Sequence, residues 1–183
     1  STNVKKSAYY PYGLYTLGYL DMKQKQYDDA REHFSLFLKN NKNVPSYLTL
    51  DVYNRMGDCL YVSKEFEEAI RFYDKNIAAK AKDADYATYQ KSMAYGAVGK
   101  YEEKFHYLNT IFERFQDSPW SSKALFEVAN TYLIMDNNEQ ALRYYQNFIK
   151  RYPHSSNAKG ALLTMGLVYY NTERSHEALE VFA

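Results

Sequence analysis

Histidine is the residue type best suited to bind a transition metal or to transfer a proton near neutral pH. This chain of 183 residues contains four histidines, which are His33, His106, His154 and His176. They occupy four different positions within the repeating pattern described below, and none has the spacing of a metal ligand. We therefore interpret each as a surface or inter-helix histidine, and the sequence predicts no catalytic residue, no metal site and no cofactor.

Residues 96–100, Gly-Ala-Val-Gly-Lys, contain the glycines and lysine that are typical of a phosphate-binding loop. A loop of that kind needs four residues between its glycines, a serine or threonine after its lysine, and a preceding strand. This segment lacks that spacing and that strand. It is better explained as a turn between two helices.

The single cysteine, Cys59, excludes both an internal disulfide and a thiolate-rich metal site. It lies two residues after a small residue, on the face of its predicted helix that packs against the protein. We expect a buried, unreactive thiol.

Composition and charge exclude several classes of function. Lysine plus arginine (23) nearly balance aspartate plus glutamate (22), and a net charge of +1 gives no electrostatic basis for binding nucleic acid. No apolar run approaches the roughly 18 residues of a membrane-spanning helix, and no signal peptide opens the chain. The unusual feature is 21 tyrosines, a residue enriched on surfaces that are both wet and adhesive.

The chain repeats one pattern five times. Each copy starts with a small residue, at Gly18, Gly57, Ser92, Ala129 and Gly166. Twelve residues later come Ala30, Ala69, Lys104, Ala141 and Ala178, and four residues after those come Phe34, Tyr73, Leu108, Tyr145 and Phe182. Measured between the second members, the steps are 39, 35, 37 and 37 residues. A period in this range is typical of a solenoid of helix hairpins.

Each repeat should therefore form two antiparallel helices, and all five should share one continuous core. The predicted repeats are approximately 11–45, 46–83, 84–120, 121–156 and 157–183. The predicted helices are 11–25, 27–39, 46–63, 65–80, 84–98, 100–115, 121–135, 137–151, 157–172 and 174–183. The second helix of the fifth repeat stops short at Ala183, so we expect a single array that is a fragment of a longer protein.

The small residues indicate where two helices approach closely. We expect the Gly18-type and Ala30-type positions to face each other, with the large residue four positions later filling the space beside that contact. Lys104 departs from this pattern. We expect its stem to lie along apolar surface, in a locally looser hairpin.

The pattern resembles the tetratricopeptide repeat, whose consensus is W-x2-L-G-x2-Y, then A-x3-F, then P. The matching residues include Leu17-Gly18 with Ala30 and Phe34, Met56-Gly57 with Ala69 and Tyr73, and Met165-Gly166 with Ala178 and Phe182. The resemblance covers nearly the whole chain after residue 10 and implies an all-α, right-handed α-solenoid of about five hairpins. Asp21 at the tyrosine position, Lys104 at the alanine position and the absent tryptophan are departures.

Two junctions are similar to those of bacterial cell-envelope tetratricopeptide proteins. These are RFQDSPWSSKALFEVANTYL and RYPHSSNAKGALLTMGLVYY. The likeness implies a location in the bacterial periplasm or at the outer membrane, with the cytoplasm as the alternative.

In proteins of this family the first helix of each hairpin lines a concave groove that receives a peptide or a partner helix. We expect tyrosines of the first three repeats to grip a partner, with Asn54 and Arg55 reading its polar groups. The candidate partner-binding residues are Tyr12, Tyr15, Tyr19, Asn54, Arg55, Asp58, Tyr61, Tyr86, Tyr89, Gln90, Lys123, Phe126 and Asn130. The alternative is that these tyrosines pack against neighbouring helices or against a missing repeat.

The resemblance thus implies a non-catalytic scaffold or adaptor that binds protein or peptide, with a role in bacterial envelope assembly. Two other functions stay open at this point: an architectural spacer in a larger protein, and a regulatory segment beside an enzymatic domain. The sequence identifies neither the partner nor the oligomeric state.

Overall fold

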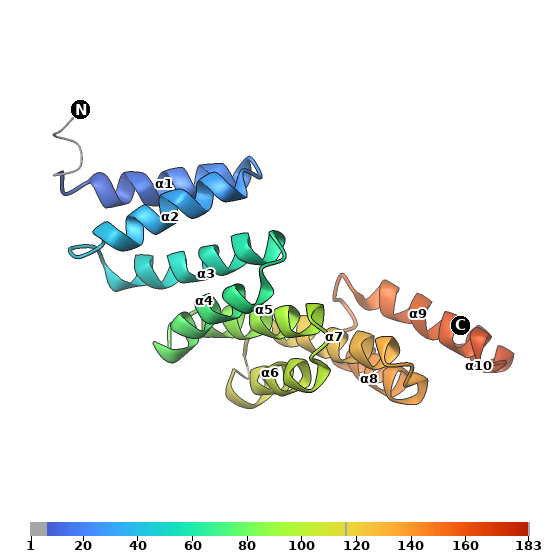
Figure 1. The fold of residues 1–183 in the computed structure, drawn as a ribbon. Coiled ribbons are helices and arrows are strands. Elements are labelled where there is room, and N and C mark those ends of the chain that lie inside the picture. Colours follow the sequence, from blue (N-terminus) through green and yellow to red (C-terminus); the bar gives the residue numbers. More distant parts are fainter. Residues whose placement is uncertain (1–6, 116, 183) are drawn as a thin grey trace. The chain divides into compact units, whose positions relative to one another are not determined.

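The structure, a computed structural model, describes residues 7–115 and 117–182, which form ten α-helices and no β-strand (Figure 1). The helices are α1 (Tyr10–Lys23), α2 (Tyr27–Asn40), α3 (Ser46–Val62), α4 (Phe66–Ala78), α5 (Ala84–Ala97), α6 (Tyr101–Arg114), α7 (Ser121–Ile134), α8 (Asn138–Arg151), α9 (Ala158–Asn171) and α10 (Ser175–Glu180). The first nine begin and end within two residues of the predicted helices. The predicted end of the tenth, Ala183, lies outside the described residues.

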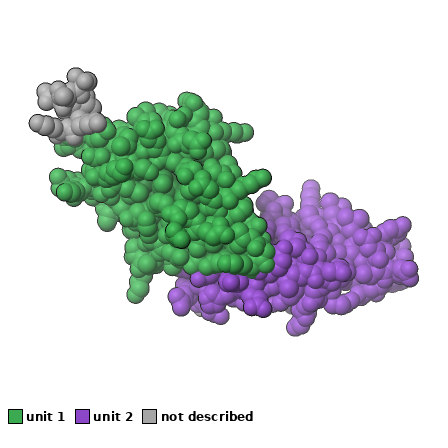
Figure 2. Space-filling view, viewed as in Figure 1, with its two compact units in different colours: residues 1–100 green, residues 101–183 purple. Residues whose placement is uncertain are grey.

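The chain divides into two compact units, residues 1–100 and residues 101–183, shown in green and purple in Figure 2. The first unit contains α1 to α5, and each of these helices contacts the next one along the chain. The second contains α6 to α10, and the same is true there. Each unit is thus a row of helices that contact their sequence neighbours, as in a solenoid. The all-α prediction is confirmed.

Local sequence favours the second helix of each hairpin. Acidic residues occupy the first turn of α2, α4, α6, α8 and α10, where they interact favourably with the helix dipole. The Asn137 side chain accepts a hydrogen bond from the Gln140 N–H at 3.2 Å and caps α8. These helices place their large residues inside: Phe34, Tyr73, Leu108 and Tyr145 are fully buried.

A left-handed residue ends the first helix of every hairpin. These residues are Lys25, Lys64, Gly99, Asp136 and Glu173, with φ between 56° and 75°. The N–H of the following residue donates to a carbonyl five positions back, over 2.8–3.0 Å, which makes each turn a Schellman motif. Gly99 lies in the segment that resembled a phosphate loop, so the interpretation of that segment as a turn is confirmed. Only this repeat uses glycine there.

The glycines at the start of the pattern make room for an aromatic ring. A Cβ placed on Gly18 would lie 2.5 to 2.8 Å from three ring carbons of Phe34, and one on Gly166 would lie 2.5 Å from the ring of Phe182. Gly57 has the same relation to Tyr73. The nearest neighbour of the glycine is therefore the large residue four positions after the alanine, which fills the space beside it as predicted.

Two other sequence expectations concern single side chains. Cys59 is fully buried, as predicted, and burial raises the pKa of its thiol to about 12. His33 Nδ1 lies 2.6 Å from the Asp21 carboxylate across the first hairpin. Asp21 occupies a position where the family consensus has tyrosine. Its contact with His33 of α2 gives a structural reason for an aspartate there.

Candidate functional site

A charged stripe runs along one face of α3. Asp51, Arg55 and Asp58 are four and three residues apart, a spacing that places their side chains on the same side of a helix. Arg55 Nε lies 3.5 Å from Asp51 Oδ1, and Arg55 Nη1 lies 2.7 Å from Asp58 Oδ2. The three side chains are only 12% to 25% exposed. This stripe is the centre of the candidate site in the first unit.

Two tyrosines of α1 bind one end of the stripe. Both hydroxyls donate to Asp51 Oδ2, that of Tyr15 over 2.9 Å. The two rings lie 4.9 Å apart, and the Tyr19 ring meets Phe34 edge-on. Burial raises the pKa of both tyrosines, and for Tyr19 the bond to Asp51 raises it further. Both hydroxyls therefore remain protonated donors at neutral pH.

Asp58 receives donors from two other helices. Its Oδ1 accepts hydrogen bonds from Tyr73 of α4 at 3.0 Å and from Tyr86 of α5 at 2.7 Å. Gln90 lies at 3.4 Å from the same atom. The guanidinium of Arg55 stands 5.1 Å from the centre of the Tyr86 ring, a cation–π distance. The stripe thus joins α1, α3, α4 and α5.

The electrostatics of the stripe favour a fixed structure. Burial raises the pKa of the Asp58 carboxyl, although Arg55 and the hydrogen bonds from its neighbours oppose this. Burial alone would lower the pKa of Arg55, but Asp58, Tyr86, Asp51 and Tyr19 together outweigh it and the pKa is raised. Arg55 therefore stays charged and occupies the space between two carboxylates and a ring. The arrangement positions side chains, and most of its polar atoms bind one another. The buried Nε of Arg55 has no hydrogen-bond partner within the described part of the chain and lies 3.5 Å from Asp51 Oδ1.

These contacts decide where the predicted tyrosines point. The hydroxyls of Tyr15, Tyr19 and Tyr86 bind carboxylates of α3 within the first unit. This placement agrees with the alternative that the tyrosines pack against neighbouring helices. Their rings are only partly buried, so part of each still faces outward.

The predicted role of Asn54 needs correction. Asn54 is fully buried, and its amide donates to Asp83 Oδ2 over 2.6 Å. Asn76 of α4, also fully buried, donates to the other oxygen of Asp83 over 3.0 Å. Asn54 therefore holds the start of α5 in place and has no surface to offer a partner. Its position three residues before Gly57 is covered by the start of α5, whose Asp83 accepts the hydrogen bond.

A second polar network lies in the second unit. The Lys104 ammonium is buried and lies 3.0 Å from Glu127 Oε2 on α7. Asn130 donates to Glu127 Oε1 over 3.1 Å and accepts from the Tyr145 hydroxyl over 2.5 Å. The expectation that Lys104 follows apolar surface outward is therefore wrong. Glu127 supplies the partner that a buried ammonium group needs.

The remaining candidates are more scattered. Tyr12 is 38% exposed on α1, and Tyr89 is partly buried on α5. Tyr61 meets Phe66 edge-on at the start of α4. Lys123 is exposed, with its ammonium 4.2 Å from the centre of the Trp120 ring.

Phe126 also lies in the second unit, where its ring is 5.8 Å from that of Tyr145 and 5.4 Å from that of Phe148. It is partly buried and packs against the core of that unit. Of the candidates in this unit, Phe126 and Asn130 therefore both contact Tyr145, whereas Lys123 contacts the Trp120 ring.

Sequence reasoning did not include Asp51, Tyr73 and Glu127 among the partner-binding candidates. Asp51 and Glu127 lie at groove positions of the family pattern, so a search for carboxylates at those positions would have included them. Tyr73 was recognised only as the large residue of its repeat. Its hydroxyl contact with Asp58 has no signal in the sequence, because it depends on how α4 is placed against α3.

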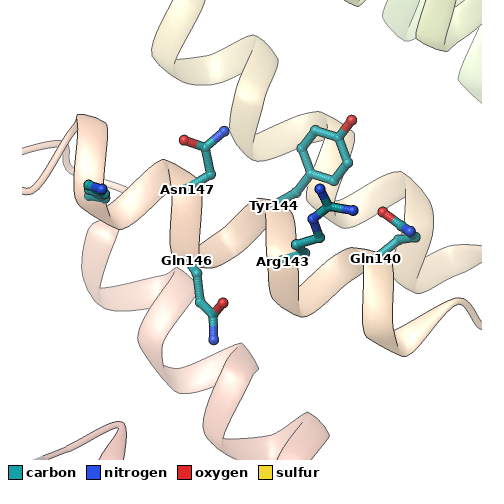
Figure 3. A pocket seen from close by; sticks show the side chains of 6 residues that line it. Gln140, Arg143, Tyr144, Gln146 and Asn147 are labelled. Carbon is teal, nitrogen blue, oxygen red and sulfur yellow. The ribbon is translucent and has the colours of Figure 1, made fainter.

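A depression of about 460 Å³ lies along α8. Figure 3 shows the side chains on its wall, which are Gln140, Arg143, Tyr144, Gln146, Asn147 and Lys150. Gln146 points to α9, where it donates to the Tyr169 hydroxyl over 3.2 Å, and the Tyr144 ring stacks on Tyr132 of α7. The wall combines three amides, two cations and a tyrosine, all from one helix.

Among residues 7–115 and 117–182, no three histidine, cysteine, aspartate or glutamate side chains gather as metal ligands would. Within the same residues, no helix is long and apolar enough to cross a membrane.

Known proteins resemble this chain in two of its parts. The tetratricopeptide repeat family matches residues 15–84 and again residues 123–155, together just over half of the chain. None of the curated proteins matches it.

Solved structures agree on the fold. A crystal structure of MamA protein is 16% identical, with a TM-score of 0.72 over 96% of this chain and 90% of that one. BtubC from P. vanneervenii is 13% identical, with a TM-score of 0.75 over 97% of this chain and 78% of its own. The apo form of RapI has a TM-score of 0.83 at 11% identity, over 94% of this chain and 51% of its own. These matches support the repeat fold and give no support to a cell-envelope type of repeat.

Proposed function

Because the chain is built of tetratricopeptide repeats, we propose that it is a non-catalytic scaffold that binds a peptide or a partner helix against the first helices of its hairpins. The single observation that carries the proposal is the row of tyrosine rings on α1 and α5. The hydroxyls of Tyr15, Tyr19 and Tyr86 are held by Asp51 and Asp58, so these three rings have fixed orientations before a partner arrives. A ring that is already ordered loses little conformational entropy on binding.

The proposed contact surface differs from that expected from the sequence. Partner contact is assigned to the ring faces of these three tyrosines and to Tyr12 and Tyr89, which lie at other groove positions of the family pattern. Tyr12, at 38%, is the most exposed of the five. Arg55 is assigned a positioning role, because both its carboxylate partners and the Tyr86 ring surround it. Asn54 takes no part, since it is fully buried.

Selection of displayed random peptides on the immobilised chain would test this proposal. Tyr12→Ala and Tyr89→Ala should each weaken a selected peptide by about tenfold, the loss expected for truncating an aromatic anchor. Tyr144→Ala is the matched control, since this partly buried tyrosine lies on α8, the second helix of its hairpin. Equal peptide binding by all three variants, with helical content unchanged, would show that the peptide does not bind through these groove tyrosines.

The two junctions that are similar to cell-envelope repeats support a further proposal, a location in the bacterial periplasm or at the outer membrane. Fractionation of cells that produce the protein would test it, and recovery with the cytoplasmic proteins would contradict it.

A further inference from the structure

The longest stretch of the sequence without an acidic residue lies in the second unit. Residues 140–172 contain four lysines and arginines but no aspartate or glutamate, whereas the two signs of charge are nearly equal in the chain as a whole, 23 against 22. The stretch covers most of α8 and all of α9. A surface lined by charge of one sign attracts partners of the opposite sign.

Two of these cations line the depression along α8. Arg143 and Lys150 are exposed, and they lie seven residues apart, which is two helical turns or about 10 Å along the helix axis. Among the described residues, neither takes part in an ion pair. The only acid of α8, Glu139, pairs instead with Arg174 at 2.9 Å. Both cations are therefore available to an anionic group from outside the chain.

Amide side chains accompany the cations on this wall. Gln140 and Asn147 are three residues before and four residues after Arg143, a spacing that places all three on one side of the helix. Figure 3 shows Arg143 and Asn147 on the side of α8 opposite to Gln146. Within the residues that the structure describes, the Gln140 and Asn147 side chains make no hydrogen bond. An amide offers a donor and an acceptor, as a peptide backbone does, whereas a phosphodiester backbone offers acceptors only. The wall therefore suits a peptide better than a nucleic acid.

We propose that this face of α8 binds an acidic peptide segment of another protein in the polyproline II conformation. Arg143 and Lys150 pair with two of its carboxylates, and the neighbouring amides hydrogen-bond its backbone. A polyproline II segment rises about 3.1 Å per residue with three residues per turn, so side chains three apart share one side at about 9 Å. That distance matches the two cations. In a β-strand the distances on one side are about 7 or 13 Å, which match less well. The ligand should therefore carry aspartate or glutamate at every third position.

This site is separate from the tyrosine surface of the proposed function. Those tyrosines lie on α1 and α5 in the first unit, whereas α8 is the second helix of a hairpin in the second unit. Tyr144 is part of the α8 wall, but its ring stacks on Tyr132 with 5.3 Å between the ring centres. It is therefore assigned to the packing of the hairpin and not to the ligand. The two binding proposals can be tested independently.

The test uses a fluorescein-labelled, proline-rich peptide with glutamate at every third position and measures its anisotropy as the full chain is added. Arg143→Gln and Lys150→Gln should each weaken binding about threefold to fivefold, the loss expected for an exposed ion pair. Both residues are exposed, so the variants should fold. Replacing the glutamates of the peptide by glutamine should weaken binding about tenfold, because both pairs are lost. Added salt should weaken binding as well, because it screens exposed charges.

Arg71→Gln is the matched control. Arg71 is exposed and has the same place in the second repeat as Arg143 has in the fourth, two residues after the alanine, but it pairs with Glu68 at 2.9 Å. The substitution removes the same charge and should leave peptide binding unchanged. An equal loss in Arg71→Gln and Arg143→Gln would show that net charge alone attracts the peptide, and would overturn the proposal. A chain that binds a single-stranded oligonucleotide but not the peptide would overturn it too, as would a chain that binds neither.

Discussion

Gly18 and Gly13 lie on the same helix and should respond in opposite ways to alanine. In a helix interior alanine is favoured over glycine by about 0.8–1 kcal/mol. A Cβ on Gly13 meets no atom within 4 Å, so Gly13→Ala should stabilise the protein by about 0.5–1 kcal/mol. A Cβ on Gly18 would lie 2.5 Å from a ring carbon of Phe34, whereas carbon atoms normally approach to about 3.5–4 Å.

The Phe34 ring has no room to move away. It is fully buried, and the Tyr19 ring stands edge-on to it, 5.9 Å away. Overpacking costs about 1–3 kcal/mol, and three ring carbons within 2.8 Å place this substitution in the upper part of that range, at about 2–3 kcal/mol. After subtraction of the helix-propensity gain, Gly18→Ala should destabilise the protein by about 1–2 kcal/mol. The two variants should therefore differ by about 1.5–3 kcal/mol.

Urea denaturation followed by circular dichroism would measure both changes, with the denaturant slope compared to confirm that the same structure unfolds. A Gly18→Ala protein as stable as the unmodified chain would refute the reasoning. It would show that the two helices of the hairpin adjust easily to a Cβ at this position. The fourth repeat already has such a pair, with Ala129 at the position of Gly18 and Tyr145 at that of Phe34.

Three further predictions follow from the turns and the polar networks. Lys64→Gly should raise the free energy of unfolding by about 0.5–1 kcal/mol and Gly99→Ala should lower it by about 1 kcal/mol, because both positions have positive φ, and thermal unfolding would measure both. Lys104→Ala should cost about 3–5 kcal/mol by leaving Glu127 without its partner, whereas replacing both residues by apolar ones should recover most of the loss in the same assay. Asp58 has a raised pKa in the folded state, so its contribution to stability is complete below its ordinary pKa of 3.8 and is lost as pH rises through the raised value. Stability relative to Asp58→Asn should accordingly increase as pH falls through that window, and a difference that is constant with pH would contradict the assignment.

The repeat, the ten helices and the burial of Cys59 could be predicted from the sequence. Helix periodicity is a local property, since side chains three and four residues apart share a face whatever packs there. The period of 35 to 39 residues then implies stacked hairpins, because a single hairpin cannot bury its apolar face alone. The position of Gly99 in a turn could be predicted from the local sequence as well. The positive φ of the four non-glycine residues in the equivalent turns could not be predicted.

Only the tertiary structure decided which polar groups meet. Asn54 and Asp58 lie one turn apart on α3, yet Asn54 is buried against Asp83 while Asp58 collects tyrosines from α4 and α5. Lys104 likewise lies inside because Glu127 of α7 stands 3.0 Å away. These pairings depend on the distance and rotation between helices, which arise from the packing of many side chains at once. The sequence by itself determined that this chain forms helical repeats with a tyrosine-rich face, and the packing of those helices determined that the tyrosine hydroxyls face carboxylates of the chain itself.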